Sequence, residues 1–94
     1  MKNLIAITTD FGDGFASVQL RAILSSLHSA GDVIENHTIT PFSILEGAFQ
    51  ILILSRFTPP NSVHVGVVDP GVGSERKGIV IKTKGLGYFR ADFF

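Results

Sequence analysis

Hydrophobic positions along the first part of the chain fall into two kinds of pattern. Residues 4–8 form a continuous apolar run between polar residues, which is typical of a strand buried on both faces. From residue 15 to about residue 27 apolar side chains recur at helical spacing, which predicts an amphipathic helix capped by Asp13 or a neighbour. Residues 33–39 then alternate between two faces, as expected of a strand nearer to a sheet edge.

The same plan continues after a turn at residues 40–42. Ser43 and Glu46 match a capping box, in which the serine accepts from the helix start and the glutamate bonds back to the serine N–H. A second helix is therefore predicted from about residue 44 to residue 55. Residues 62–68 predict another buried strand.

Two further strands complete the pattern, one at residues 78–83 and one that begins at Tyr88. The order is β-α-β-α-β-β, which predicts a three-layer α/β fold with an open, largely parallel sheet. Right-handed crossovers make the first three strands parallel, so the loops after Thr8, Ile39 and Val68 leave the sheet at one edge. Ligands of open α/β sheets bind at that edge.

Composition indicates one compact domain at most, residues 1–94. The chain is 45% hydrophobic and has a formal net charge of zero. The balanced charge, without a run of Lys and Arg, argues against partners such as nucleic acid or a membrane surface. The first apolar stretch is too short for a signal core or a bilayer span, so we expect a cytoplasmic protein with no membrane contact.

Metal ligands are few. The absence of cysteine excludes disulfides and thiolate metal sites. His37 and His64 fall within predicted strands and are interpreted as hydrogen-bonded structural histidines, and His28 as a helix-end residue that interacts with the helix dipole. No histidine pair has metal-ligand spacing, so no metal is assigned.

Two residues of the predicted edge have the chemistry of a nucleoside site. Asp10 lies on a glycine-flanked loop and can accept hydrogen bonds from a vicinal diol such as a ribose; the alternative is an aspartate that holds its own turn together. Phe42, beside Pro41, can form an apolar wall against a flat base, with core packing as the alternative.

The loop that follows the third strand is the predicted centre of the chemistry. Pro70 fixes its own φ, while Gly71 and Gly73 permit positive φ and expose backbone N–H groups. Such a turn can bring Asp69 and Arg76 into one small volume. The alternative is a glycine-rich connection in which the aspartate accepts backbone hydrogen bonds and the arginine is solvated.

Several motifs together resemble the amino-terminal part of the S-adenosylmethionine hydrolases, or SAM hydroxide adenosyltransferases, which are relatives of the fluorinase and chlorinase. The resemblance covers about residues 4–83 in the correct order. Any one motif is weak, whereas the Asp-Pro-Gly-Val-Gly-Ser-x-Arg run in this setting is specific. The motifs are Thr8-Thr9-Asp10-Phe11-Gly12, His37-Thr38-Ile39-Thr40-Pro41-Phe42 with Glu46-Gly47-Ala48, and residues 63–76.

The resemblance implies that hydroxide derived from water attacks the ribose C5′ of S-adenosylmethionine, so that methionine leaves and adenosine forms without a cofactor. By carry-over, Asp69 and Arg76 orient and activate the water. The residues implied to bind substrate are Asp10 at the ribose hydroxyls, Phe42 at the adenosine wall, Phe11, Gly71 and Val72. The halogenating relatives differ at residues 69–74, which favours hydrolysis over halide transfer.

Members of this family are much longer than 94 residues. The resemblance implies a carboxy-terminal domain that holds substrate across a trimer interface, and a catalytic histidine beyond Phe94. Residues 90–94 also depart from the Gly-Pro-Asp-Asn-Gly-like loop of the family. We therefore expect a partial amino-terminal domain of a homotrimeric hydrolase. The second hypothesis is a catalytically inactive fragment that binds nucleosides or self-associates.

Overall fold

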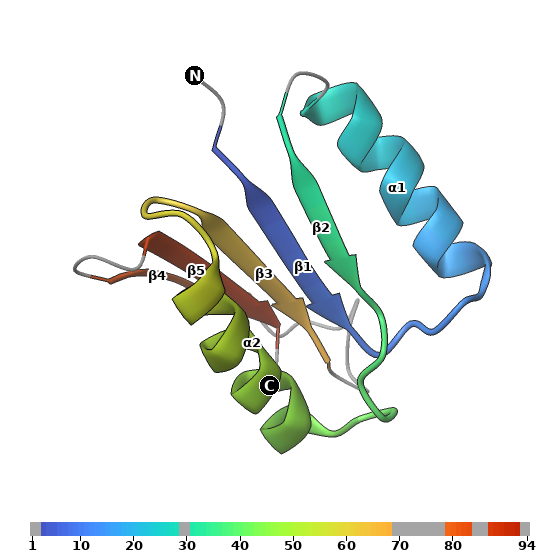
Figure 1. Ribbon diagram of the computed structural model, residues 1–94. Helices are drawn as coiled ribbons and strands as arrows, with labels where there is room; N and C mark the ends of the chain where they lie inside the picture. The colour runs from blue at the N-terminus through green and yellow to red at the C-terminus, as the bar shows by residue number, and fades with distance from the viewer. Residues whose placement is uncertain (1–2, 29–30, 69–78, 84–86, 93–94) are drawn as a thin grey trace.

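Within the residues that the structure describes, the chain forms a five-stranded sheet with two helices (Figure 1). A computed structural model describes residues 3–28, 31–68, 79–83 and 87–92. The strands run in the spatial order β2-β1-β3-β5-β4. The elements are β1 (Ile5–Thr9), α1 (Phe15–Leu27), β2 (Val33–Asn36), α2 (Ile44–Phe57), β3 (Val63–Val67), β4 (Ile79–Thr83) and β5 (Gly87–Asp92).

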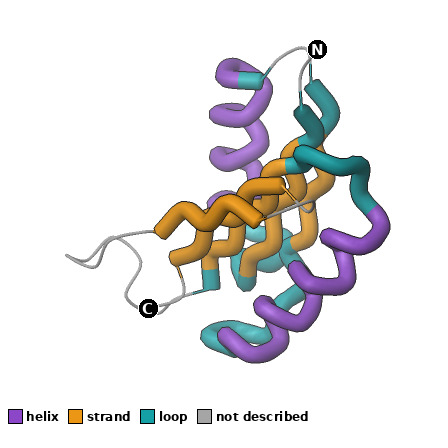
Figure 2. The backbone as a smooth tube through the Cα atoms, turned by 90° about the vertical axis from the view of Figure 1, so that its left-hand side faces the viewer, coloured by secondary structure: helices purple, strands orange, loops and turns teal. Residues whose placement is uncertain are grey.

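The first three strands are parallel, as predicted. Strand β1 pairs with β2 on one side, where Thr8 lies opposite Asn36, and with β3 on the other, where Thr9 lies opposite Val67. Strand β5 is parallel to β3, and β4 returns antiparallel to β5. The crossover from β1 to β2 and the crossover from β2 to β3 run across the sheet in opposite directions, so α1 and α2 cover opposite faces of the sheet (Figure 2). The predicted three-layer α/β fold is confirmed.

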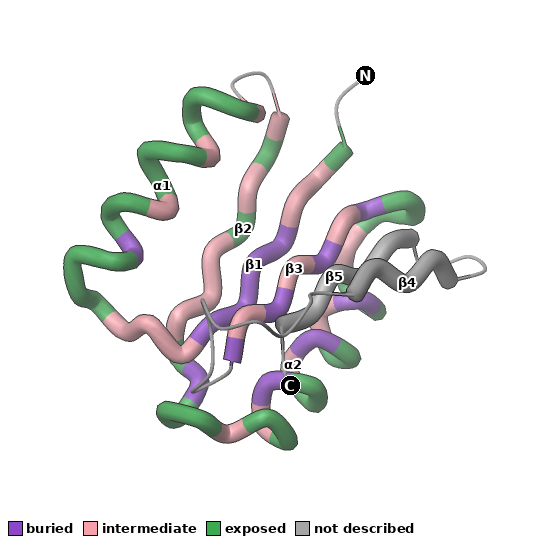
Figure 3. Tube along the Cα trace, turned by 180° about the vertical axis from the view of Figure 1, so that it is seen from behind, coloured by how far each residue is buried: buried purple, intermediate pink, exposed green. Residues whose placement is uncertain are grey.

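Among the strands whose burial is described, β1 is the most buried (Figure 3). The last four residues of β1, from Ala6 to Thr9, are buried, which fits a strand covered on both faces. Helix α2 packs against β1 and β3 through a narrow stripe in which Gly47, Ile51 and Ser55 are buried. The core is therefore centred on β1 and on the α2 side of the sheet.

Strand β2 is an edge strand, as predicted, but it ends at Asn36 and not at residue 39. The backbone beyond Asn36 bonds to the loop that follows β1 and not to a strand. The Gly12 N–H donates to the His37 carbonyl at 3.2 Å, and the Ile39 N–H donates to the Thr9 carbonyl at 3.3 Å. Beyond Asn36 these backbone hydrogen bonds to the loop replace the strand-to-strand hydrogen bonds of the sheet. His37 therefore lies one residue after the end of β2.

The helix ends match the sequence in part. Ser43 caps α2, because its Oγ accepts from the Glu46 N–H at 3.4 Å. The reciprocal bond of the capping box is absent: the Glu46 carboxylate accepts from the Thr40 N–H at 3.3 Å, while the Ser43 N–H donates to the Thr40 carbonyl. For α1 the sequence predicts a cap by Asp13 or a neighbour: the cap residue is the neighbour, Gly14, and no side chain bonds to the helix start.

Helix α1 is amphipathic in sequence, but most of its apolar side chains are exposed. Only Ser17 is buried, while Leu20 and Leu24 are half-buried. Large apolar side chains are also exposed on α2. The exposed apolar side chains of the two helices include Phe15, Val18, Ile23, Leu27, Leu45, Phe49 and Phe57. Neither helix is long and apolar enough to cross a membrane, nor is any other helical segment in the described part of the chain.

Replacing the α2 cap tests this account of the helix start. Ser43→Ala removes the side-chain acceptor of the Glu46 N–H, so we expect the free energy of unfolding to fall by about 1 kcal/mol. Urea denaturation monitored by circular dichroism measures this change. The control is Ser25→Ala on the exposed surface of α1, which should change stability by less than about 0.5 kcal/mol. Equal effects of the two substitutions would contradict the cap.

Candidate functional site

The carboxyl ends of the three parallel strands bring distant segments together, as the sequence predicts. Strand β1 leads into Asp10, and β2 leads into the segment at residues 37–42. The link between them is direct: Asp10 Oδ2 accepts a hydrogen bond from the Phe42 N–H at 2.8 Å. Strand β3 ends at Val67 beside Thr9, and buried Val68 follows it. Asp69, Gly71, Val72 and Arg76 lie outside the described residues, so their roles stay predictions.

Asp10 connects two loops rather than holding only its own turn. Its bonded partner, Phe42, is 32 residues away in the chain. Asp10 is half-buried as a residue, and the second oxygen of its carboxylate, Oδ1, has no hydrogen bond to the described residues. Asp10 therefore retains one oxygen with which it can accept from a ligand hydroxyl.

Phe42 lies at the surface beside Asp10. Its residue is 63% exposed, so the alternative of core packing is wrong. Its φ is +66°, in the left-handed region that phenylalanine rarely adopts. The bond from its N–H to Asp10 holds this strained backbone, and strain of this kind is concentrated at functional sites. The exposed ring remains suited to lie against a flat ligand.

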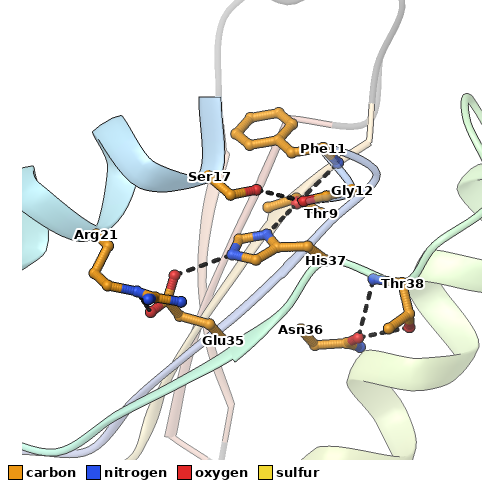
Figure 4. A network of polar contacts seen from close by, with 9 residues as sticks. All are labelled: Thr9, Phe11, Gly12, Ser17, Arg21, Glu35, Asn36, His37 and Thr38. Atoms are coloured by element: carbon orange, nitrogen blue, oxygen red, sulfur yellow. Dashed lines mark hydrogen bonds and ion pairs between the residues drawn. The ribbon is translucent and has the colours of Figure 1, made fainter. Parts of the chain in front are cut away.

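A chain of polar contacts that begins at Thr9, the residue before Asp10, joins three elements (Figure 4). Thr9 Oγ1 lies 2.6 Å from His37 Nδ1, and His37 Nε2 lies 3.0 Å from Glu35 Oε1. At the outer end, Arg21 Nε of α1 donates to Glu35 Oε2 at 2.9 Å. The Arg21 side chain is 69% exposed, so this outer ion pair contributes little to stability.

The direction of the hydrogen bonds follows from the partners. An ionised Glu35 carboxylate only accepts, so His37 Nε2 carries a proton and donates to it. In the neutral imidazole Nδ1 is then an acceptor, and the Thr9 hydroxyl donates to it. The Thr9 oxygen in turn accepts from the Phe11 N–H at 3.1 Å. Each polar side-chain atom of Thr9, His37 and Glu35 thus has a complementary hydrogen-bond partner.

Phe11 is half-buried and lies against the same histidine. Its ring is nearly parallel to the His37 imidazole, with an interplanar angle of 3° and 6.2 Å between ring centroids. The loop is further tied to α1, because Ser17 Oγ donates to the Gly12 carbonyl at 2.6 Å. Phe11 therefore belongs to the edge at which Asp10 lies, while its predicted contact with substrate stays a prediction.

Among the residues that the structure describes, Glu35 and His64 have shifted pKa values, for different reasons. The hydrogen bond from His37 lowers the pKa of Glu35 below its ordinary value of 4.5, and Arg21 lowers it further, against the opposing effect of burial. Burial lowers the pKa of His64, which lies in β3 with its Nε2 3.2 Å from Thr58 Oγ1. The interpretation of His37 and His64 as hydrogen-bonded structural histidines is confirmed.

Sequence reasoning missed Thr9 and Glu35, and it gave His37 no role at the edge. The available signal was spacing: Glu35 and His37 are two residues apart, so extended backbone places their side chains on one face. What could not be read locally is that Thr9, 28 residues from His37, lies next to it. Among the described residues, no three His, Cys, Asp or Glu side chains are grouped to hold a metal ion.

A hollow of about 270 Å³ lies at the opposite edge of the sheet, where the parallel strands begin. Ligands of open α/β sheets bind at the carboxyl ends of the strands, so this hollow is not part of the candidate site. It is lined by Asn3, Leu4, Asp32, Pro59, Pro60, Asn61 and Ser62.

Acidification tests the charged state of Glu35. Because its pKa is lowered on folding, ionised Glu35 stabilises the fold above pH 4.5, and this contribution is lost as the pH falls below that value. Glu35→Gln should therefore lower the free energy of unfolding by up to about 1 kcal/mol at pH 7 and by progressively less towards pH 3.5.

Urea denaturation of both proteins from pH 7 to pH 3.5 measures this difference. Buried His64 lowers the free energy of unfolding of both proteins equally as the pH falls below 6.5. The reason is that His64 binds a proton more readily in the unfolded chain than in the folded chain. The contribution of His64 therefore cancels in the difference between the two proteins, which reports on Glu35 and its contacts with His37 and Arg21. A difference that does not depend on pH would show that the Glu35 charge has no such role.

Comparison with known proteins shows the family to which this chain is similar. Residues 5–92 match the family described as the SAM hydroxide adenosyltransferase N-terminal domain. The (R)-S-adenosyl-L-methionine hydrolase of Methanocaldococcus jannaschii is 44% identical over 93% of this chain, and that of Salinispora arenicola is 39% identical over 88%. A fluorinase of an Actinoplanes species is 29% identical over 86%. The chain spans about a third of the length of these relatives: 35%, 32% and 28% respectively.

Solved structures share the fold. An uncharacterized conserved protein from Thermotoga maritima superposes with a TM-score of 0.85 at 32% identity, covering 93% of this chain and 34% of the other. A conserved hypothetical protein from Thermus thermophilus shares the fold alone, with a TM-score of 0.80 at 22% identity, covering 96% of this chain and 38% of the other. The resemblance inferred from the sequence motifs is confirmed. This chain belongs to the SAM hydroxide adenosyltransferase family, and its residues 5–92 match the amino-terminal domain of that family.

Proposed function

We propose that this chain supplies the nucleoside-binding edge and the water-activating loop of an enzyme that hydrolyses S-adenosylmethionine. Hydroxide derived from water attacks the ribose C5′, the bond from C5′ to sulfur breaks, and methionine leaves with that electron pair, so that adenosine forms. The observation that carries the proposal is the hydrogen bond from the backbone N–H of exposed Phe42 to the Asp10 carboxylate at the carboxyl edge of the sheet. Family membership supports the same reaction.

In this proposal Asp10 accepts from the ribose hydroxyls and Phe42 lies against the adenine. One Asp10 oxygen already holds the Phe42 backbone, so the other is directed to the ligand. The two proposed contacts lie side by side, because the Phe42 N–H bonds to the carboxylate that would bind the sugar. Phe11, Gly71 and Val72 are proposed to complete the contacts with substrate.

Asp69 and Arg76 are proposed to orient and activate the water. A sulfonium is a good leaving group, so the enzyme mainly has to supply an aligned and poorly hydrated oxygen nucleophile. Alignment of this kind is worth roughly 7–11 kcal/mol. Attack of an anion on a cation also cancels charge, which a site that excludes water favours. The Arg76 guanidinium would keep Asp69 ionised and hold it through a two-point contact.

The names of the relatives narrow the substrate. The two hydrolases described above are called (R)-S-adenosyl-L-methionine hydrolases, so we propose the R configuration at sulfur for the substrate of this chain. The proposed setting is a cytoplasmic homotrimer that uses no cofactor or metal and contacts neither nucleic acid nor membrane.

A second candidate is a module that binds nucleosides or self-associates without turnover. The exposed apolar side chains of α1 and α2 favour it, since surface of this kind mediates association. Adenosine binding by calorimetry, with sedimentation for the oligomeric state, separates the two: binding without adenosine production favours the module.

Turnover gives the first test of the proposed function. The chain incubated with S-adenosylmethionine should release adenosine, and should do so faster from the R than from the S epimer. Asp69→Asn keeps the size of the side chain but removes its charge, so we expect at least a hundredfold loss of rate, within the range of general-base catalysis. Chromatography of the products measures both. Equal rates for Asp69→Asn and the unaltered chain would exclude Asp69 as the activating group.

Arg76→Lys gives the second test. It preserves the positive charge but replaces a planar two-point donor with a single ammonium group, so we expect a loss of rate of more than tenfold. Arg56→Lys, on the exposed surface of α2, is the matched control and should leave the rate unchanged. Activity of Arg76→Lys within a few-fold of the unaltered chain would count against the proposed role.

A further inference from the structure

His37 contacts the loop after β1 through its backbone, its imidazole nitrogen and its ring face, although it lies outside the paired strands. Its carbonyl accepts from the Gly12 N–H at 3.2 Å, its Nδ1 lies 2.6 Å from Thr9 Oγ1, and its ring lies parallel to that of Phe11. Beyond His37 the Ile39 N–H donates to the Thr9 carbonyl at 3.3 Å. These contacts surround Asp10 on both sides along the chain.

The order carboxylate, imidazole, hydroxyl in Glu35, His37 and Thr9 is that of a hydrolytic triad. Burial excludes that function. Thr9 has an exposed fraction of 0%, and its oxygen already accepts from the Phe11 N–H, so it cannot reach a substrate. The chain of contacts points instead to fixing the backbone on either side of Asp10.

We propose that Glu35, His37 and Thr9 form a positioning unit that holds Asp10 in place for a ribose diol. The inference deepens the proposed function and rests on the nucleoside site described there. Thr9 is held through its side chain and its carbonyl, and Phe11 is held through its N–H. Asp10 lies between them, and the Phe42 N–H bonds to its Oδ2. With the backbone and Oδ2 both held, the position of the other oxygen, Oδ1, is fixed as well. Recognition of two adjacent hydroxyls depends on this placement, whereas contact with the adenine does not.

The strand offers a matched pair of threonines for the experiment. Thr9→Val preserves shape but removes the oxygen that His37 and Phe11 share. Thr9→Ser retains that oxygen and should restore the function. Thr8→Val makes the same chemical change one residue earlier, in a residue that is also buried but faces the other side of the sheet, and whose side chain has no hydrogen bond to the described residues.

Calorimetry with adenosine and with 2′,3′-dideoxyadenosine separates positioning from general loss of structure. The unaltered chain should bind adenosine more tightly because only adenosine has the diol. Thr9→Val should weaken adenosine binding by about tenfold and leave the affinity for dideoxyadenosine within twofold, while Thr9→Ser and Thr8→Val retain the preference. A merely structural role would instead weaken both ligands equally or neither, and either result would overturn the inference.

A second variant protects the test against loss of folding. His37→Phe keeps a flat ring beside Phe11 but has no nitrogen to bond Thr9, so it should lose the preference for adenosine in the same way. If the folded variant retains the preference, the inference is wrong. If the unaltered chain itself shows no preference for adenosine, the failure lies with Asp10 as the ribose ligand, which is the proposed function and not its positioning.

Discussion

Parallel pairing of β1 with a neighbour on each side is the constraint from which the candidate site follows. In a parallel sheet all carboxyl ends meet at one edge, and β1 is the only one of the first three strands that touches both of the others. The loop that carries Asp10 is therefore placed between the segment after β2 and the end of β3. The strand itself is buried on both faces, which makes it apolar until its last two residues. Polar chemistry is thus concentrated where pairing ends.

The polar residues at this edge illustrate how burial and partners set the behaviour of similar side chains. His64 is buried in β3, and loss of hydration lowers its pKa. His37 is instead hydrogen-bonded between a hydroxyl and a carboxylate, and its donation lowers the pKa of Glu35. A buried polar group is costly unless it is paired. The hydrogen bond between His37 and Thr9 avoids the free-energy cost of leaving the buried Thr9 hydroxyl unpaired at the end of β1. The same bond holds the loop after β1 against the segment after β2.

Fold and chemistry are separable in this family. The relatives include proteins named as hydrolases and one named as a fluorinase, and the chain matches both kinds over most of its length. Likeness to both kinds of relative therefore assigns this chain to a family and not to one reaction. Reactions carried by one fold differ through the residues of the site, and the loop after β3 is the proposed source of that difference.

The sequence by itself determined the elements and their order. Continuous apolar runs, helical spacing and the Ser43 cap are local, and they located α1 exactly and the start of α2 correctly. Parallel pairing followed from the element order, because handedness leaves few alternatives. Convergence of Asp10 with the segment that carries Phe42 could therefore be predicted without coordinates.

Only the tertiary structure decided how each polar group is used. Nothing local indicated that Glu46 would bond to Thr40, that Gly14 would cap α1 without a side chain, or that Phe42 would be exposed. The contact between Thr9 and His37 spans 28 residues, and that between Asp10 and Phe42 spans 32. A hydrogen bond forms only when the distance between donor and acceptor is correct to within a few tenths of an ångström. Periodicity along a chain specifies which face a side chain lies on but not such a distance.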